Sequence, residues 1–240
     1  MKDQNFTYKY KSSEYNFMVP PQSFTPTSTS FLLLETLIDQ RDSLNFQKTL
    51  DLGCGIGFVA LMLSKLKVNS NLIFGSDISE MSINAAKVNA KNLIVDSEFR
   101  CGSLFDPWNN EKFDLIINDV SGISEKVLSL SDWFKNVPQA TGKDGTTLTS
   151  KVIEESINYL APSGKMITPI LGLQNQDELI KKLGSVFNNF SLINEMFWPL
   201  SKELTTHIEE LKKLDKMGMI ELDQRYNLYG WWTRIYLGET

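Results

Sequence analysis

The residues Asp51-Leu52-Gly53-Cys54-Gly55-Ile56-Gly57 decide how this sequence folds. They end a short apolar stretch, Lys48–Leu52, that predicts a β-strand, and they precede a second one, Phe58–Leu66, that predicts a helix. Glycines at such a junction let the backbone turn tightly and approach a ligand, while the first N–H groups of the helix face that ligand. The order of strand, acidic residue, three spaced glycines and helix therefore predicts a cofactor-binding turn.

The spacing of the glycines separates two classes of cofactor. The dinucleotide-binding pattern is Gly-x-Gly-x-x-Gly, which would place its third glycine at position 58. Position 58 is Phe58, and the pattern here is Gly-x-Gly-x-Gly with an acid two residues before the first glycine. A dinucleotide-dependent oxidoreductase is therefore the least favoured interpretation.

Strand and helix patterns alternate along most of the chain. Further strands are expected at Leu72–Asp77, Glu98–Cys101, Phe113–Asp119, Lys165–Leu171 and Leu192–Trp198. Helices are expected at Ser30–Leu44, from the N-cap Ser79 to Asn92, at Ser150–Leu160 and at Asp177–Phe187. This alternation predicts an α/β fold with a doubly wound, mostly parallel sheet.

The two ends of the chain depart from this alternation. Residues 1–25 are polar and aromatic, and Pro20, Pro21 and Pro26 interrupt regular elements, so we expect an extended N-terminal arm. Near the other end, the amphipathic helix Lys202–Lys216 precedes a strand at Trp231–Leu237. We expect residues 26–198 and 230–240 to form one domain, with residues 199–229 as a helical insert between its last two strands.

The composition excludes several classes of protein. The 240 residues include one histidine and two cysteines without a Cys-x-x-Cys pair, so we expect no metal site. No apolar stretch approaches the ~20 residues that span a bilayer, and we expect a cytoplasmic protein with no membrane partner and with buried, reduced thiols at Cys54 and Cys101. The net charge of −5 argues against a protein that holds nucleic acid by its overall field.

The acidic residue and spaced glycines resemble motif I of class I S-adenosylmethionine-dependent methyltransferases. The resemblance implies a Rossmann-like sheet of seven strands with an antiparallel last strand, and S-adenosyl-L-methionine as the cofactor. In this class the glycine turn wraps the methionine end of the cofactor, whose ammonium and sulfonium groups suit a nearby carboxylate such as Asp51. Asp77 ends the next strand, about 20 residues past the glycines, where α/β nucleotide sites place a carboxylate on ribose hydroxyls.

The resemblance extends this site to further residues. The loop at Ser103 and Leu104 borders the adenine in the family, and we include Ile78, Ser30 and Asp119 among the residues expected at the cofactor. The complete expected cofactor site is Asp51, Gly53, Cys54, Gly55, Gly57, Asp77, Ile78, Ser103, Leu104, Asp119 and Ser30.

Several segments resemble one branch of the class, the HemK/PrmC-like group, which includes release-factor glutamine N5-methyltransferases. They are the segment from Val19-Pro20 and Phe24 to Leu33, Ser103-Leu104-Phe105 followed by Phe113–Ile117, Gly142-Lys143-Asp144-Gly145, Leu160–Lys165, and Gln174. The similarity covers about residues 24–187, which is most of the chain.

The chain departs from this group at motif IV. The family has Asn-Pro-Pro-Tyr, in which Asn and a carbonyl accept hydrogen bonds from a planar NH2 group and Tyr stacks on it. The aligned residues here are Asp119-Val120-Ser121-Gly122, without the prolines or the aromatic ring. Asp119 still accepts from an N–H, and it suits the role of a base or of a partner for an ammonium group. We therefore expect Asp119, and secondarily Ser121, to act on the methyl acceptor.

The sequence thus predicts methyl transfer, most readily to a nitrogen of a small molecule, peptide or protein side chain. Methyl transfer from a sulfonium requires positioning and desolvation of the acceptor more than proton transfer, which agrees with the single histidine. Two alternatives stay open: a methyltransferase acting on RNA or DNA bases, and a non-catalytic cofactor-binding subunit. A homodimer also stays open. Loop aromatics are candidates for a lid in place of the missing ring, namely Tyr15, Phe17, Trp108, Trp133, Phe134 and Trp198.

Overall fold

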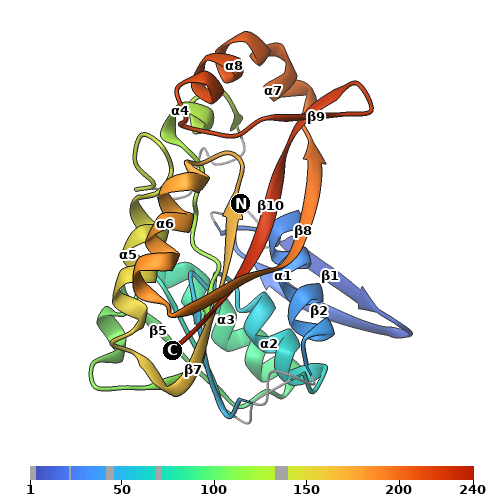
Figure 1. The fold of residues 1–240 in the computed structure, drawn as a ribbon. Helices are drawn as coiled ribbons and strands as arrows, with labels where there is room; N and C mark the ends of the chain where they lie inside the picture. Colours follow the sequence, from blue (N-terminus) through green and yellow to red (C-terminus); the bar gives the residue numbers. More distant parts are fainter. Residues whose placement is uncertain (1–3, 22, 42–45, 69–71, 133–139) are drawn as a thin grey trace. The chain divides into compact units, whose positions relative to one another are not determined.

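The computed structural model describes residues 4–21, 23–41, 46–68, 72–132 and 140–240 (Figure 1). Two compact units divide the chain between them. Unit 1 comprises Met1–Asp119 and Asn158–Met166, and unit 2 comprises Val120–Ile157 and Ile167–Thr240. One strand, β7 (Leu160–Leu171), begins in unit 1 and continues in unit 2.

Unit 1 contains a parallel sheet whose strand order places a ligand site. The strands are β3 (Lys48–Leu52), β4 (Leu72–Asp77), β5 (Ser97–Cys101) and β6 (Phe113–Asn118), in the order β5-β4-β3-β6. The β3–β4, β4–β5 and β3–β6 pairs are all parallel, and β7 follows β6. The chain proceeds outward from β3 to β5 and then returns to the other side of β3. Ligands of such sheets bind where the strand order reverses, at the carboxyl ends of the strands, here those of β3 and β6.

Three helices of unit 1 form a layer beside its sheet. They are α1 (Ser28–Asp39), α2 (Phe58–Lys65) and α3 (Glu80–Leu93), and α2 packs against both of the others. The hydroxyl of Ser79 accepts a hydrogen bond from the Ser82 N–H, which confirms the expected N-cap. A single turn of 3₁₀ helix, η1 (Asp106–Trp108), follows β5.

An antiparallel hairpin precedes these helices, where an arm without regular elements was expected. Strands β1 (Gln4–Tyr10) and β2 (Ser13–Val19) pair in register from Gln4–Val19 to Tyr10–Ser13. Lys11, in the turn between the two strands, has φ 53°. The side chain of Phe17 on β2 is buried. The prolines begin at Pro20, just after β2, so they end the hairpin and do not prevent it. The expectation was therefore wrong for residues 4–19.

Unit 2 completes the fold with antiparallel strands. Its strands are the second part of β7, β10 (Leu228–Glu239), β8 (Asn189–Pro199) and the short β9 (Asp223–Arg225). β10 lies between β7 and β8 and is antiparallel to β8 and to β9. The helices are α4 (Glu125–Leu128), α5 (Thr147–Ser156), α6 (Gln176–Val186), α7 (Lys202–Thr206) and α8 (Ile208–Lys216). The predicted α/β fold with a mostly parallel sheet and an antiparallel last strand is confirmed.

Several element boundaries differ from those expected. The expected helix Lys202–Lys216 is two helices that meet at His207, and the helix expected to reach Leu160 ends at Ser156. β7 already begins at Leu160, because Gly164 lets its backbone pass close to β6. A Cβ atom at Gly164 would lie 3.0 Å from the carbonyl oxygen of Phe113. α4 and β9 were not expected.

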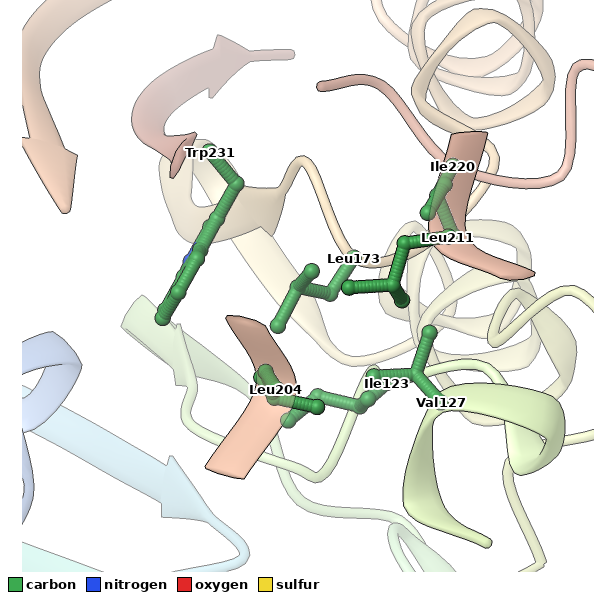
Figure 2. Packing of buried hydrophobic residues seen from close by; sticks show 7 residues of the cluster. All are labelled: Ile123, Val127, Leu173, Leu204, Leu211, Ile220 and Trp231. Atoms are coloured by element: carbon green, nitrogen blue, oxygen red, sulfur yellow. The ribbon is translucent and has the colours of Figure 1, made fainter. Parts of the chain in front are cut away.

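An apolar cluster in unit 2 joins residues 199–229 to the segment that follows Gly122 (Figure 2). Leu204 of α7, Leu211 of α8 and Ile220 pack with Ile123 and Val127, together with Leu173 and Trp231. Figure 2 shows these side chains gathered around Leu173. Among the described residues, no helix is long and apolar enough to cross a membrane.

Candidate functional site

The glycine turn of unit 1 has a backbone that favours glycine at three positions. Gly53, Gly55 and Gly57 have φ values of 73°, 52° and 81°. The N–H groups of Gly53 and Cys54 both donate to the carbonyl oxygen of Ser76 on β4, at 2.9 and 3.1 Å. Left-handed backbone costs a residue with a side chain roughly 1–2 kcal/mol, so the three glycines are a requirement of the turn.

Gly55 and Gly57 have different surroundings in this turn. A Cβ atom at Gly57 would lie 3.1 Å from side-chain atoms of Leu61 and Phe99, so Gly57 lets α2 pack closely. A Cβ atom at Gly55 would have nothing within 4 Å. The backbone at Gly55 therefore borders open space, and a ligand can approach it there.

Asp51 presents a buried carboxylate oxygen without a partner. The residue is only 1% exposed; its Oδ2 accepts from the Ala60 N–H at 3.3 Å, and its Oδ1 accepts no hydrogen bond from any described residue. Burial, and next the charge of Asp119, raise the pKa of Asp51 well above its usual value. An unsatisfied buried acceptor costs about 1–3 kcal/mol, and a cationic or N–H-bearing ligand would recover that energy.

Asp77 connects the glycine turn to α3. Its Oδ2 accepts from the Gly55 N–H at 3.0 Å, and its Oδ1 accepts from the Ser79 N–H at 2.8 Å. Burial raises the pKa of Asp77, although both of these hydrogen bonds oppose the shift. Because each carboxylate oxygen accepts more than one hydrogen bond, the two backbone contacts leave capacity for ribose hydroxyls.

Asp119 is the third carboxylate at this edge of the sheet. It directly follows β6, and its N–H donates to the Leu52 carbonyl at 3.0 Å. Its Oδ2 accepts from the Ser30 hydroxyl of α1 at 3.0 Å. Burial raises the pKa of Asp119 to about 7, although the hydrogen bond from Ser30 acts in the opposite direction. Asp51, Asp77 and Asp119 thus lie at or next to the carboxyl ends of three neighbouring strands, where the strand order reverses.

The remaining expected cofactor residues surround this edge. Ile78, directly after Asp77, is 64% exposed. Leu104 has φ 47°, and its carbonyl accepts from the Ser76 hydroxyl at 2.7 Å. The Ser103 carbonyl accepts from the Asp106 N–H at the start of η1.

The two thiols differ from each other. Cys54 is buried as expected, and burial raises its thiol pKa well above the usual value. Cys101 is exposed, so the expectation that it is buried was wrong. It ends β5, which is the edge strand of the sheet that the described residues form.

Unit 2 contains Val120-Ser121-Gly122, the rest of the segment that was aligned with motif IV. The hydroxyl of Ser121 is buried and has no hydrogen-bond partner among the described residues. The fully buried Gln174 amide, in the orientation that satisfies both of its ends, donates to the carbonyls of Gly122 and Gly145, at 2.6 and 3.0 Å. A Cβ atom at Gly122 would lie 2.5 Å from the end of the Gln174 side chain, so no ring fits at this position.

Two of the aromatic residues that were candidates for a lid, Trp108 and Phe17, are buried. Trp108 is fully buried and packs edge-on against Phe74 and Phe113, so it belongs to the core. Phe17 is also buried, in the hairpin. Trp198 is partly buried and donates its indole N–H to Thr233 at 3.0 Å, while Trp133 and Phe134 lie outside the described residues.

Known proteins are similar to this chain in sequence and in fold. The methyltransferase small domain family matches residues 26–119. A protein of Methanocaldococcus jannaschii named "Putative protein N5-glutamine methyltransferase" is 29% identical over 163 residues, which cover 68% of this chain and 79% of the relative. The release factor glutamine methyltransferase of Aliivibrio fischeri is 37% identical over 103 residues, 42% of this chain and 36% of that enzyme.

A solved structure supports the fold alone. The 16S rRNA N2 G1207 methyltransferase of T. thermophilus, solved with AdoMet and guanosine, has a TM-score of 0.65 at 14% identity. The match covers 99% of this chain and 50% of that one.

The fold, the glycine turn and these relatives define a class I S-adenosylmethionine-dependent methyltransferase. Within that class, residues 26–119 match the methyltransferase small domain family, and the similar proteins include ones named as N5-glutamine methyltransferases. The chain spans most of the archaeal relative's length but only about a third of the A. fischeri enzyme's.

The residues of unit 1 fit the cofactor of this class. The partnerless Oδ1 of Asp51 suits the ammonium group of S-adenosylmethionine, and the open backbone at Gly55 leaves room for its methionine end. Asp77 has acceptor capacity for the ribose, and the exposed side chain of Ile78 offers an apolar surface to a base. When bound, the cofactor supplies an activated methyl group on its sulfonium.

Proposed function

We propose that this methyltransferase transfers the methyl group of S-adenosylmethionine to a nitrogen atom of a protein or peptide side chain, or of a small molecule with the same chemistry. The observation that carries the proposal is the arrangement of Asp51, Gly55 and Asp119 at the switch point of unit 1. It combines a buried acceptor for a cation, an open backbone and a second carboxylate that titrates near neutral pH.

Asp119 is the residue that we assign to the acceptor nitrogen. Its Oδ2 is hydrogen-bonded to Ser30, which fixes the carboxylate and leaves Oδ1 for an N–H of the acceptor. An amine that arrives as an ammonium ion must lose a proton before it attacks, and a carboxylate with a pKa of about 7 can accept that proton near neutral pH. A neutral amide nitrogen needs the orientation that the hydrogen bond provides, and the N-methyl amide releases its extra proton to Asp119 or to water after the methyl transfer.

The loop after Asp119 supports an acceptor other than a stacked base. In the family pattern an aromatic ring at the fourth motif IV position stacks on the planar acceptor, whereas Gly122 here faces the Gln174 amide too closely for any side chain. The net charge of −5 gives no general attraction for nucleic acid. The relatives named as glutamine methyltransferases also favour a protein acceptor.

The acceptor can be identified by label transfer. Purified protein is incubated with cell extract and S-adenosylmethionine labelled in its methyl group, and the extract is then separated into protein, RNA and metabolite fractions. We expect label in the protein or metabolite fraction, and amino-acid analysis of that fraction should find it on nitrogen. Label in RNA would contradict the proposed acceptor, and label in no fraction would favour a non-catalytic cofactor-binding subunit.

A further inference from the structure

Asn89 is a fully buried amide on the apolar face of α3. The other buried positions of this helix are occupied by small or apolar residues, including Ile83, Ala86 and Ala90. Burying an amide side chain costs free energy unless its donors and acceptor are paired. The Asn89 side chain, at 0% exposure, therefore needs hydrogen-bond partners for its amide.

The amide of Asn89 joins two segments that are far apart in sequence. Its Oδ1 accepts from the Met18 N–H at 2.7 Å, and its Nδ2 donates to the Met18 carbonyl at 3.1 Å. The same Nδ2 donates to the carbonyl of Ile56 at 3.0 Å. Met18 belongs to β2 of the hairpin, and Ile56 lies between Gly55 and Gly57. One side chain thus fixes the hairpin and the glycine turn to each other.

Aromatic packing makes a second connection between the same two segments. Phe58 is the first residue of α2, directly after Gly57. The hairpin rings of Phe6, Tyr8 and Phe17 lie 5.6, 5.1 and 5.5 Å from the ring of Phe58, measured between centroids, and all three meet it edge to face. The hairpin therefore packs on the start of the helix that the turn opens.

We propose that Asn89 is a positioning residue for the cofactor turn and that the hairpin Gln4–Val19 acts through it as a clamp on Ile56. Gly55 and Gly57 on either side of Ile56 allow the backbone many conformations, so the turn loses entropy whenever it becomes ordered. A fixed Ile56 carbonyl imposes that order before the ligand arrives, which improves affinity. The inference rests on the proposed function, because the ligand of the turn is the methionine end of S-adenosylmethionine.

The test is the variant Asn89→Asp, which is nearly isosteric and replaces the NH2 donor group with a carboxylate oxygen that faces the Met18 and Ile56 carbonyls. Calorimetry measures its affinity for S-adenosylhomocysteine, which carries the amino-acid end, and for 5′-methylthioadenosine, which lacks it. We expect about tenfold weaker binding of the first ligand and less than about threefold weaker binding of the second. The matched control is Asn92→Asp, the same change at an exposed position of α3, with both affinities unchanged.

The variant Phe6→Leu weakens the packing of the hairpin on Phe58 without changing α3. We expect it, too, to weaken the binding of S-adenosylhomocysteine more than that of 5′-methylthioadenosine. It also carries the test if Asn89→Asp fails to fold. Equal weakening of both ligands, or unchanged binding of both by a folded variant, would overturn the inference, because a merely structural asparagine does not distinguish the ligands. Failure of the wild-type protein to bind S-adenosylhomocysteine would overturn the proposed function, and this inference with it.

Discussion

At the scale of single residues, the site is defined by carboxylates that burial keeps from ionising easily. Asp51, Asp77 and Asp119 all have raised pKa values, and burial is the largest cause for each. The charge of Asp119 also raises the pKa of Asp51. A cationic ligand relieves both effects, so the site is matched to a positively charged cofactor.

The variant Asp119→Asn separates cofactor binding from acceptor chemistry. Asparagine keeps the hydrogen-bonding shape of Asp119 but cannot accept a proton at neutral pH. Against an amine acceptor identified by label transfer, we expect turnover to fall by about 100-fold or more, with the affinity for S-adenosylmethionine within about threefold of wild type. Wild-type turnover should rise with pH through about 7, and the variant should lack this rise. A variant with wild-type turnover would remove Asp119 from the mechanism.

The raised pKa of Asp119 also predicts how stability depends on pH. The folded protein holds this proton up to about pH 7, whereas an unfolded aspartate releases it near pH 4. The resulting stabilisation is therefore complete below about pH 4 and is lost as the pH rises through about 7. Thermal unfolding at pH 5, 6, 7 and 8 should show a larger decrease of Tm for the wild type than for Asp119→Asn. Parallel profiles would show that the carboxyl titrates normally.

At the scale of elements, the loop Val120–Ser124 shows how a chain without the motif IV prolines keeps this segment in place. Gln174 holds the carbonyls of Gly122 and Gly145, and the Ser124 hydroxyl donates to the Lys143 carbonyl at 2.6 Å. Beyond them, Ile123 packs into the cluster with α7 and α8. Hydrogen bonds from the Gln174 and Ser124 side chains, together with apolar packing, thus hold this segment, which has no proline.

The substitution Gly122→Ala tests this arrangement. The added methyl group would lie 2.5 Å from the end of the Gln174 side chain, which is buried and hydrogen-bonded and so has little freedom to move. We expect a loss of about 1–3 kcal/mol in the free energy of unfolding, measured by urea denaturation. In the double variant with Gln174→Ala, the effect of Gly122→Ala should largely disappear. Full additivity of the two changes would refute the contact.

The elements that sequence patterns predict well are those with local signals. β3 and β4 have the expected bounds, Lys48–Leu52 and Leu72–Asp77, because each is a short apolar run that ends in glycine or aspartate. The hairpin was missed because its pairing depends on residues such as Phe17 that pack on helices far along the chain. α7 and α8 were expected as one helix, since the break at His207 has no proline or glycine to mark it.

The candidate site was predictable to the same extent. Asp51, Asp77 and the glycines follow from their spacing after two strands, and their structure agrees with a ligand-facing turn. Asn89 was not found, because its partners lie 71 and 33 residues away in the sequence. A signal did exist, namely an asparagine among the small and apolar residues of the buried helix face, but that signal does not name the partners.

At the scale of the whole molecule, the two units contain different features of the chain. Unit 1 contains the glycine turn, the three carboxylates and the hairpin, all of which we assign to the cofactor or to the acceptor nitrogen. Unit 2 contains Ser121, Gln174 and the cluster that includes residues of the segment 199–229. The residues that we assign to the cofactor and to the acceptor nitrogen therefore all lie in unit 1.

The most direct test of the central claim is a calorimetric titration of the wild-type protein with S-adenosylmethionine, with NAD as the comparison ligand. We predict binding of one S-adenosylmethionine per chain and no binding of NAD. In the control variant Asp51→Asn, which keeps the shape of the residue but loses its charge, the affinity for S-adenosylmethionine should fall by about tenfold or more. Binding of NAD without binding of S-adenosylmethionine would contradict the account.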